Sequence, residues 1–153
     1  MHAGPPPADL PKAVLFACSL NAVRSPMAAA MLRHLAGRRI YVESGGVRPG
    51  ESDPFAIAVM DEIGIDLSKH APRALADLYD TSFDLVISLS PEAHHQALEM
   101  TRTQAIEAEY WPTMDATAAM GSREQILGAY REVRDTLFRK IKARFPLPSA
   151  PDL

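Results

Sequence analysis

The sequence lacks the features that mark several broad classes of protein. It has one cysteine among 153 residues, which excludes an internal disulfide, a cysteine-based zinc cluster and a Cys-x-x-Cys redox pair. No apolar run approaches the roughly 18 residues that a transmembrane helix needs. The formal net charge is −3, so a broad basic surface for nucleic acid is not expected. These absences predict a chain that binds neither a membrane nor nucleic acid.

Proline is concentrated at the two ends of the chain. Of the 13 prolines, four lie in residues 1–11 and three in residues 146–153. We predict that these two segments are flexible tails, and that residues 12–145 form a single domain. The first segment also lacks the apolar core of a secretory signal. Together with the unpaired cysteine, this favours a cytoplasmic location.

Strand and helix patterns alternate between the tails. Short apolar runs predict strands over 12–18, 39–44, 83–89 and 105–111. Capping residues and prolines predict helices over 25–36, 53–64, 72–78, 90–100 and 122–144. This alternation predicts an α/β fold, with helices on both faces of a parallel sheet. Such sheets bind ligands beyond the carboxyl ends of their strands.

Cys18 ends the first predicted strand, so its thiol is expected at that edge of the sheet. Arg24 follows six residues later, and Ser25-Pro26 begins the next predicted helix. The loop between them can turn its backbone N–H groups toward one point, beside the positive end of the helix. The planar guanidinium of Arg24 suits two oxygens of a tetrahedral oxyanion, and the same field stabilises a thiolate. We therefore interpret Cys18 as a nucleophile beneath an oxyanion site, and not as a buried core residue.

The remaining loop residues fit this interpretation. The predicted oxyanion-binding loop consists of Ser19, Leu20, Asn21, Ala22, Val23, Arg24 and Ser25. Asn21 tolerates the unusual backbone conformation that a tight loop requires. The hydroxyl of Ser25 is suited to donate a hydrogen bond to the sulfur, which would help the thiolate to leave in a later step.

The pattern Cys-x5-Arg-Ser-Pro after a first strand resembles the low-molecular-weight protein tyrosine phosphatases and the arsenate reductases that share their fold. The segments Ser44-Gly45-Gly46, 64–70 and 83–87 are also similar to segments of that family. The resemblance covers nearly all of residues 12–145. It implies a three-layer fold in which a four-stranded parallel sheet has the strand order 2-1-3-4.

The resemblance also implies a role for each site residue. Cys18 would form a phosphocysteine, Arg24 would bind the phosphoryl oxygens, and Asp115 would be the general acid on the loop after the fourth strand. A polar network that holds the loop in shape would consist of Asn21, Ser25, Ser44 and His70. The chemistry calls for no metal and no cofactor, because phosphoryl transfer depends mainly on positioning and charge stabilisation.

Three positions depart from the family pattern. Leu20 stands where the phosphatases usually have glycine, and a positive φ there would strain leucine by about 1 kcal/mol. Val23 stands where many members have a second cysteine, so a protective disulfide beside the nucleophile is excluded. Asp115 is followed by Ala116-Thr117 in place of a proline and tyrosines. The aromatic wall that grips a phosphotyrosine ring is therefore missing at this point.

Three functions remain open at this stage. The first is a phosphatase that hydrolyses phosphotyrosine or small aryl phosphate monoesters, on a phosphorylated protein or a small molecule. The second is an arsenate reductase, because arsenate has the shape and charge of phosphate. Its cycle would need an external thiol or a glutaredoxin-like partner, since the chain has no further cysteine. The third is a non-catalytic oxyanion-binding module.

Overall fold

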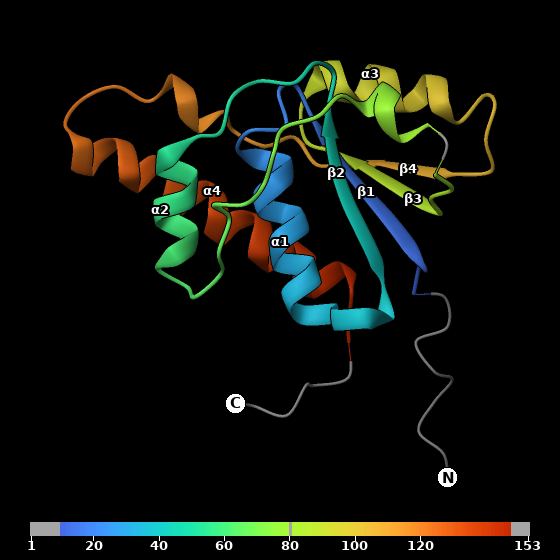
Figure 1. Cartoon of the computed structure of the whole chain (residues 1–153), viewed down its shortest axis with the longest axis horizontal. Coiled ribbons are helices and arrows are strands. Elements are labelled where there is room, and N and C mark those ends of the chain that lie inside the picture. Colours follow the sequence, from blue (N-terminus) through green and yellow to red (C-terminus); the bar gives the residue numbers. More distant parts are fainter. Residues whose placement is uncertain (1–9, 80, 148–153) are drawn as a thin grey trace, which may run out of the picture.

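A computed structural model describes residues 10–79 and 81–147 of the chain (Figure 1). Its four strands are β1 (Ala13–Cys18), β2 (Tyr41–Gly46), β3 (Leu85–Ser88) and β4 (Glu107–Tyr110). All pair in parallel, in the order β2-β1-β3-β4. This arrangement confirms the predicted fold class and strand order.

Helices cover both faces of the sheet (Figure 1). The α-helices are α1 (Arg24–Ala36), α2 (Pro54–Asp61), α3 (Pro91–Met100) and α4 (Arg123–Arg144). Short 3-10 helices are η1 (Gly37–Arg39), η2 (Leu75–Leu78) and η3 (Ala116–Ala118). Helices α1, α2 and α4 lie on one side of the sheet and α3 lies on the other, which gives the three predicted layers.

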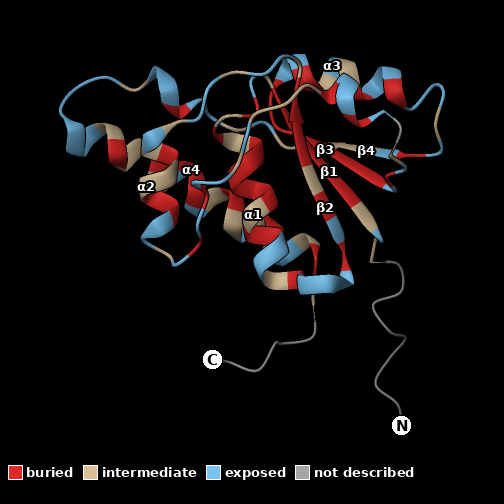
Figure 2. Cartoon of the chain, in the orientation of Figure 1, coloured by how far each residue is buried: buried red, intermediate tan, exposed pale blue. Residues whose placement is uncertain are grey.

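The hydrophobic core is divided in two by the sheet. Alternate residues of β1 point to opposite faces, as the two-residue period of a strand requires. Phe16 packs in the larger cluster, with side chains of α1 and α4, and Leu15 packs in the smaller cluster, with side chains of α3 and η2. Figure 2 shows the central strands buried along most of their length. The sheet is therefore a rigid support for the loops at its carboxyl edge.

Several element boundaries differ from the sequence-based prediction. Strand β2 begins at Tyr41 and not at residue 39, because Gly37 adopts a φ of 59° and η1 intervenes after α1. Helix α2 ends at Asp61, before Gly64 turns the chain with a φ of 78°. The helix predicted over 72–78 is reduced to η2, since Ala74 is extended and forms a bridge with Gly46. The other predicted strands are shorter by one to two residues at their ends.

The predicted tails lie mostly outside the described residues, which exclude 1–9 and 148–153. Leu10 and Leu147 belong to the predicted tails, but both pack against the larger core cluster, so the flexible-tail prediction is wrong for these two residues. Within the described part of the chain, no helix combines the length and the apolar character needed to cross a bilayer.

Helices α2, α3 and α4 begin with side-chain caps, whereas α1 does not. Asp53 accepts hydrogen bonds from two amides of α2, Ser90 caps α3, and Ser122 forms the predicted capping box with Gln125. At α1 the N-cap is Val23, which offers no side-chain acceptor. No side chain at the N-cap therefore competes for the first amides of α1, which are able to donate to groups in the preceding loop.

Candidate active site

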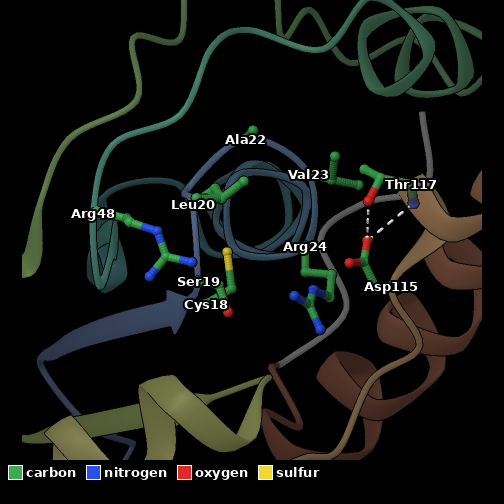
Figure 3. A pocket seen from close by; sticks show the side chains of 9 residues that line it. All are labelled: Cys18, Ser19, Leu20, Ala22, Val23, Arg24, Arg48, Asp115 and Thr117. Carbon is green, nitrogen blue, oxygen red and sulfur yellow. Dashed lines mark hydrogen bonds between the residues drawn. The ribbon is translucent and has the colours of Figure 1, made fainter.

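The cysteine loop forms the floor of a cleft of about 220 Å³ at the carboxyl edge of the sheet (Figure 3). Cys18 is the last residue of β1, and α1 begins at Arg24, so the loop joins the strand directly to the helix. The lining residues are Cys18, Ser19, Leu20, Ala22, Val23, Arg24, Arg48, Asp115 and Thr117. The structure thus brings Asp115, which is distant in sequence, to the same cleft as Cys18 and Arg24.

The sulfur of Cys18 has two hydrogen-bonding neighbours, both from Ser25. The Oγ of Ser25 lies 2.9 Å from Sγ, and the backbone N–H of Ser25 donates to Sγ over 3.4 Å. The side-chain amide of Asn21 already donates to this Oγ, so the hydroxyl proton is available for the sulfur. The carbonyl of Gly45, at 3.5 Å, is a more distant acceptor. Ser25 therefore directs both its hydroxyl and its backbone N–H at the sulfur.

Asn21 is the residue on which the loop's conformation depends. It is fully buried and has a φ of 55°, in the left-handed region that asparagine tolerates. Its Nδ2 donates to the hydroxyls of Ser25 and Ser44, both at 2.9 Å, and its Oδ1 accepts from the backbone N–H of Arg73 at 2.9 Å. Leu20 has no positive φ, so the strain considered for leucine at that position does not arise.

His70 supports the loop from below through its ring. Its Nε2 lies 2.9 Å from the carbonyl oxygen of Asn21. Burial lowers the pKa of His70 below its usual value, although the bond to Asn21 opposes that shift. The ring is therefore neutral near neutral pH, and its Nε2–H donates to the carbonyl, which has no proton of its own to give. Ser44 and His70, both predicted as loop-supporting residues, thus contact Asn21 directly.

The segment that follows β2 is hydrogen-bonded along the cysteine loop. Backbone N–H groups of Val47, Arg48 and Gly50 donate to the carbonyls of Cys18, Ser19 and Leu20 at 3.0, 3.1 and 2.8 Å. The two backbones are so close at Gly46 that a Cβ there would lie 2.7 Å from the amide nitrogen of Asn21. Only glycine fits this approach. These three carbonyls of the loop are consequently occupied by the segment that follows β2.

Arg24 and Asp115 lie on the same side of the cleft. The Nη1 of Arg24 donates to the carbonyl of Thr113 at 3.0 Å. The Oδ1 of Asp115 accepts from the hydroxyl of Thr117 at 2.6 Å and from its backbone N–H at 3.0 Å. The hydroxyl and one carboxylate oxygen are thus paired, and Oδ2 of Asp115 has no protein partner among the described residues. Figure 3 shows this carboxylate at the wall of the cleft.

A second arginine of the site, Arg48, was not predicted from the sequence. It follows β2 and lines the cleft on the side away from Arg24 and Asp115 (Figure 3). Its Nη1 donates to Oε2 of Glu92, in the first turn of α3, at 2.8 Å. Arg48 lowers the pKa of Glu92, which is therefore charged at neutral pH. One feature of the sequence indicates a functional role for Arg48: it lies just beyond a strand end, where parallel α/β sheets bind their ligands.

The lining of the cleft contains no aromatic side chain among its nine residues. Trp111, the aromatic residue nearest to Asp115 in sequence, packs edge-on against Phe16 at a centroid distance of 6.2 Å. Among residues 10–79 and 81–147, no three His, Cys, Asp or Glu side chains are grouped as a metal site. The site is therefore a small polar cleft that combines one thiol, two guanidinium groups and one carboxylate.

Comparison with known proteins places this geometry in a family. A family model described as low molecular weight phosphotyrosine protein phosphatase matches residues 13–142. An arsenate reductase of Shouchella clausii is 30% identical over 133 residues, which are 86% of this chain and 93% of the relative. A glutaredoxin arsenate reductase of Synechocystis is 37% identical over 78 residues, or 51% of this chain and 60% of the relative.

A solved structure agrees with these matches. An arsenate reductase in the phosphate binding state superposes with a TM-score of 0.70 at 30% identity. The superposition covers 88% of this chain and 97% of that one. The family match over residues 13–142 includes the strand that ends at Cys18.

Proposed function

The chain belongs to the low molecular weight phosphotyrosine protein phosphatase family, and on this premise we propose that it hydrolyses phosphate monoesters through a phosphocysteine at Cys18. One observation carries the proposal. Cys18 is the only cysteine of the chain and shares its cleft with Asp115. Ester hydrolysis needs one thiolate, one proton donor and water, so this chain can complete it without help from another thiol.

In the first step the thiolate of Cys18 attacks phosphorus. The S–P bond forms as the P–O bond to the leaving group breaks, and Asp115 gives its proton to the departing oxygen. The negative charge of the phosphoryl oxygens is met by the N–H groups of the loop, by the uncapped start of α1 and by Arg24. No other group is required, because positioning and charge stabilisation account for most of the catalysis of phosphoryl transfer.

In the second step water attacks the phosphocysteine. Asp115, now a carboxylate, takes a proton from the water, and the S–P bond breaks to release phosphate. The sulfur leaves as a thiolate, and the hydroxyl and amide of Ser25 are placed to stabilise it. The Asn21 network holds Ser25 in position, so the loop is prepared for both steps before a substrate binds.

The substrates proposed for this site are phosphotyrosine or small aryl phosphate monoesters. The cleft of about 220 Å³ has room for a small leaving group above the phosphoryl site. Since its lining lacks aromatic side chains, ring stacking does not contribute to substrate binding. Recognition would then depend on the phosphoryl group and on polar contacts at the rim.

The test is hydrolysis of para-nitrophenyl phosphate by the wild type and three variants. Cys18→Ser is expected to abolish hydrolysis, and Asp115→Asn to slow it. Asp61→Asn, at the exposed end of α2, is the matched control for the loss of a carboxylate and is expected to behave as the wild type. Hydrolysis that survives Cys18→Ser would contradict the proposal. Phosphate binding without hydrolysis would instead favour an oxyanion-binding module.

Arsenate reduction is the second candidate, favoured by the curated relatives named arsenate reductases. The sulfur of Cys18 would attack arsenic and displace one oxygen, which leaves as water with a proton from Asp115. A small external thiol would then attack this sulfur. The S–As bond would break, its electron pair would stay on arsenic as arsenite, and a mixed disulfide would remain on Cys18. A glutaredoxin-like thiol would have to reduce that disulfide.

The two candidates differ in their need for thiols. Ester hydrolysis should proceed in the absence of any added thiol. Arsenate reduction should stop completely without one, because the chain has no second cysteine. Assays with para-nitrophenyl phosphate, and separately with arsenate plus glutathione and a glutaredoxin, therefore discriminate between them. Turnover of arsenate without ester hydrolysis would make arsenate reduction the favoured function.

A further inference from the structure

Among the charged side chains that line the cleft, Arg48 is the one without a role in the proposed phosphoryl transfer. It comes from the connection between β2 and α2, outside the loop that binds the phosphoryl group. In Figure 3 its guanidinium lies on one side of the Cys18 sulfur, and Arg24 and Asp115 lie on the other. The cleft therefore has two walls: one carries the proposed acid, and the other carries a cation.

The position of Arg48 is fixed from two directions. Its backbone N–H donates to the carbonyl of Ser19 at 3.1 Å, which ties it to the cysteine loop. Its Nη1 donates to Glu92 at 2.8 Å, and the N-terminus of α3 favours a carboxylate at that point. The side chains of Arg48 and Glu92 are 58% and 46% exposed. Such an exposed ion pair adds little to the stability of the fold. Its main effect is therefore to hold the guanidinium group of Arg48 in one orientation.

Most of the hydrogen-bonding capacity of this guanidinium remains for a ligand. A guanidinium has five N–H donors, and the bond to Glu92 involves only Nη1. In the proposed mechanism the phosphoryl oxygens are bound by the loop amides and by Arg24. A substrate whose ester oxygen faces Asp115 extends out of the cleft between the two walls, where the other rim residues Leu20, Val23 and Thr117 are uncharged.

We propose that Arg48 determines specificity, selecting phosphate monoesters whose leaving group carries a second negative charge such as a carboxylate. This inference rests on the proposed function, since it assumes that the phosphoryl group sits over Cys18. A carboxylate on the leaving group would accept N–H bonds from Arg48 in the fork geometry that guanidinium groups favour. The site would then discriminate between esters by charge, where the aromatic wall of other family members is absent.

The test compares binding of two phosphonates of equal size, para-carboxybenzylphosphonate and its uncharged amide, para-carbamoylbenzylphosphonate. The measured quantity is the ratio of their dissociation constants by calorimetry. The wild type is expected to bind the carboxylate about tenfold more tightly, which is typical of one hydrogen bond to a charged group. Arg48→Met should bring the ratio close to one, and Arg48→Lys should restore part of it. High salt should reduce the wild-type ratio.

Arg102→Met is the matched control, because Arg102 is an exposed arginine paired with Glu99 beyond the end of α3. It should keep the wild-type ratio. An equal ratio in the wild type and Arg48→Met would overturn the proposal, and so would failure of both phosphonates to bind the wild type. Phosphonates bind without turnover, so the ratio is measurable even if the protein hydrolyses no ester. The two proposals can therefore fail separately.

Discussion

Arg24 donates a hydrogen bond from Nη1 to the backbone carbonyl of Thr113, 3.0 Å away. This bond joins the start of α1 to the loop after β4, two residues before Asp115. The proposed oxyanion-binding residue and the proposed acid therefore belong to segments that are tied together directly. A substitution at Arg24 should disturb both the charge of the site and the placement of that loop.

Arg24→Lys should lower kcat/KM for para-nitrophenyl phosphate by a hundredfold or more. A lysine ammonium is a point charge that cannot hold two phosphoryl oxygens in a planar fork, and losses of about 10² are typical when one such donor is removed. Steady-state kinetics give the value. The control is Arg38→Lys, at an exposed position on η1. Equal activity of Arg24→Lys and this control would rule out the proposed role of Arg24.

Asp115→Asn should slow esters with basic leaving groups more than esters with acidic ones. Phenolate is more basic than para-nitrophenolate and depends more on a proton from the acid. We expect a loss of about a thousandfold for phenyl phosphate and a much smaller loss for para-nitrophenyl phosphate, within the usual range for a general acid. The check is the ratio of the two kcat/KM values in each protein. Identical losses for the two esters would mean that Asp115 is not the proton donor.

Substitution of Asn21 should destabilise the fold as well as the loop. The side chain makes three hydrogen bonds in a buried setting, and at about 1 kcal/mol each their loss should lower the free energy of unfolding by about 3 kcal/mol. Asn21→Ala should lose about 1 kcal/mol more than Asn21→Gly, because alanine is strained at a φ of 55° and glycine is not. Urea unfolding measures both values. If the alanine variant were at least as stable as the glycine variant, the left-handed conformation would be in doubt.

His70 should make the folded state sensitive to acid. Burial lowers the pKa of His70 in the folded protein, so below the unfolded-state pKa of about 6.5 the unfolded chain binds a proton that the folded chain does not. The contribution of neutral His70 to the free energy of unfolding is therefore fully present above the unfolded-state pKa of about 6.5. It declines as the pH falls from that value toward the lower pKa of His70 in the folded protein.

The pH effect can be isolated with His70→Gln, whose side-chain amide retains a donor for the carbonyl of Asn21. Between about pH 7.5 and about pH 5.5 the wild type should lose more unfolding free energy than this variant. Urea midpoints across that range provide the measurement. Parallel slopes for the two proteins would show that His70 is not held neutral.

The central loop could be predicted from sequence because its parts are contiguous. Cys18, Arg24 and the start of α1 lie within a short stretch of chain, and the strand before and the helix after are both readable from local patterns. Asp115 was located only through the family resemblance, since no local pattern connects it with Cys18. The roles of these residues remain predictions, although the structure places all three around one cleft.

Contacts between distant segments could not be predicted from local patterns, and the family resemblance implied only some of them, such as those of Ser44 and His70 with the loop. The bond from Arg24 spans 89 residues to Thr113, and the pair of Arg48 with Glu92 spans 44 residues. The position of Arg48 just beyond the second strand was a weak local signal, and it gave no indication of the pairing with Glu92. Local backbone geometry was predicted in part: the positive φ falls on Asn21, where an unusual conformation was expected, and the strain considered for Leu20 does not arise.

The most direct test of the central claim is to locate the phosphoryl group during turnover. The wild type is mixed with para-nitrophenyl phosphate, quenched in denaturant within the first turnover, and digested for peptide mapping by mass spectrometry. The account predicts one phosphoryl group on the peptide that holds Cys18. Release of para-nitrophenol with no phosphoryl group on that peptide, or with the group on another residue, would contradict it.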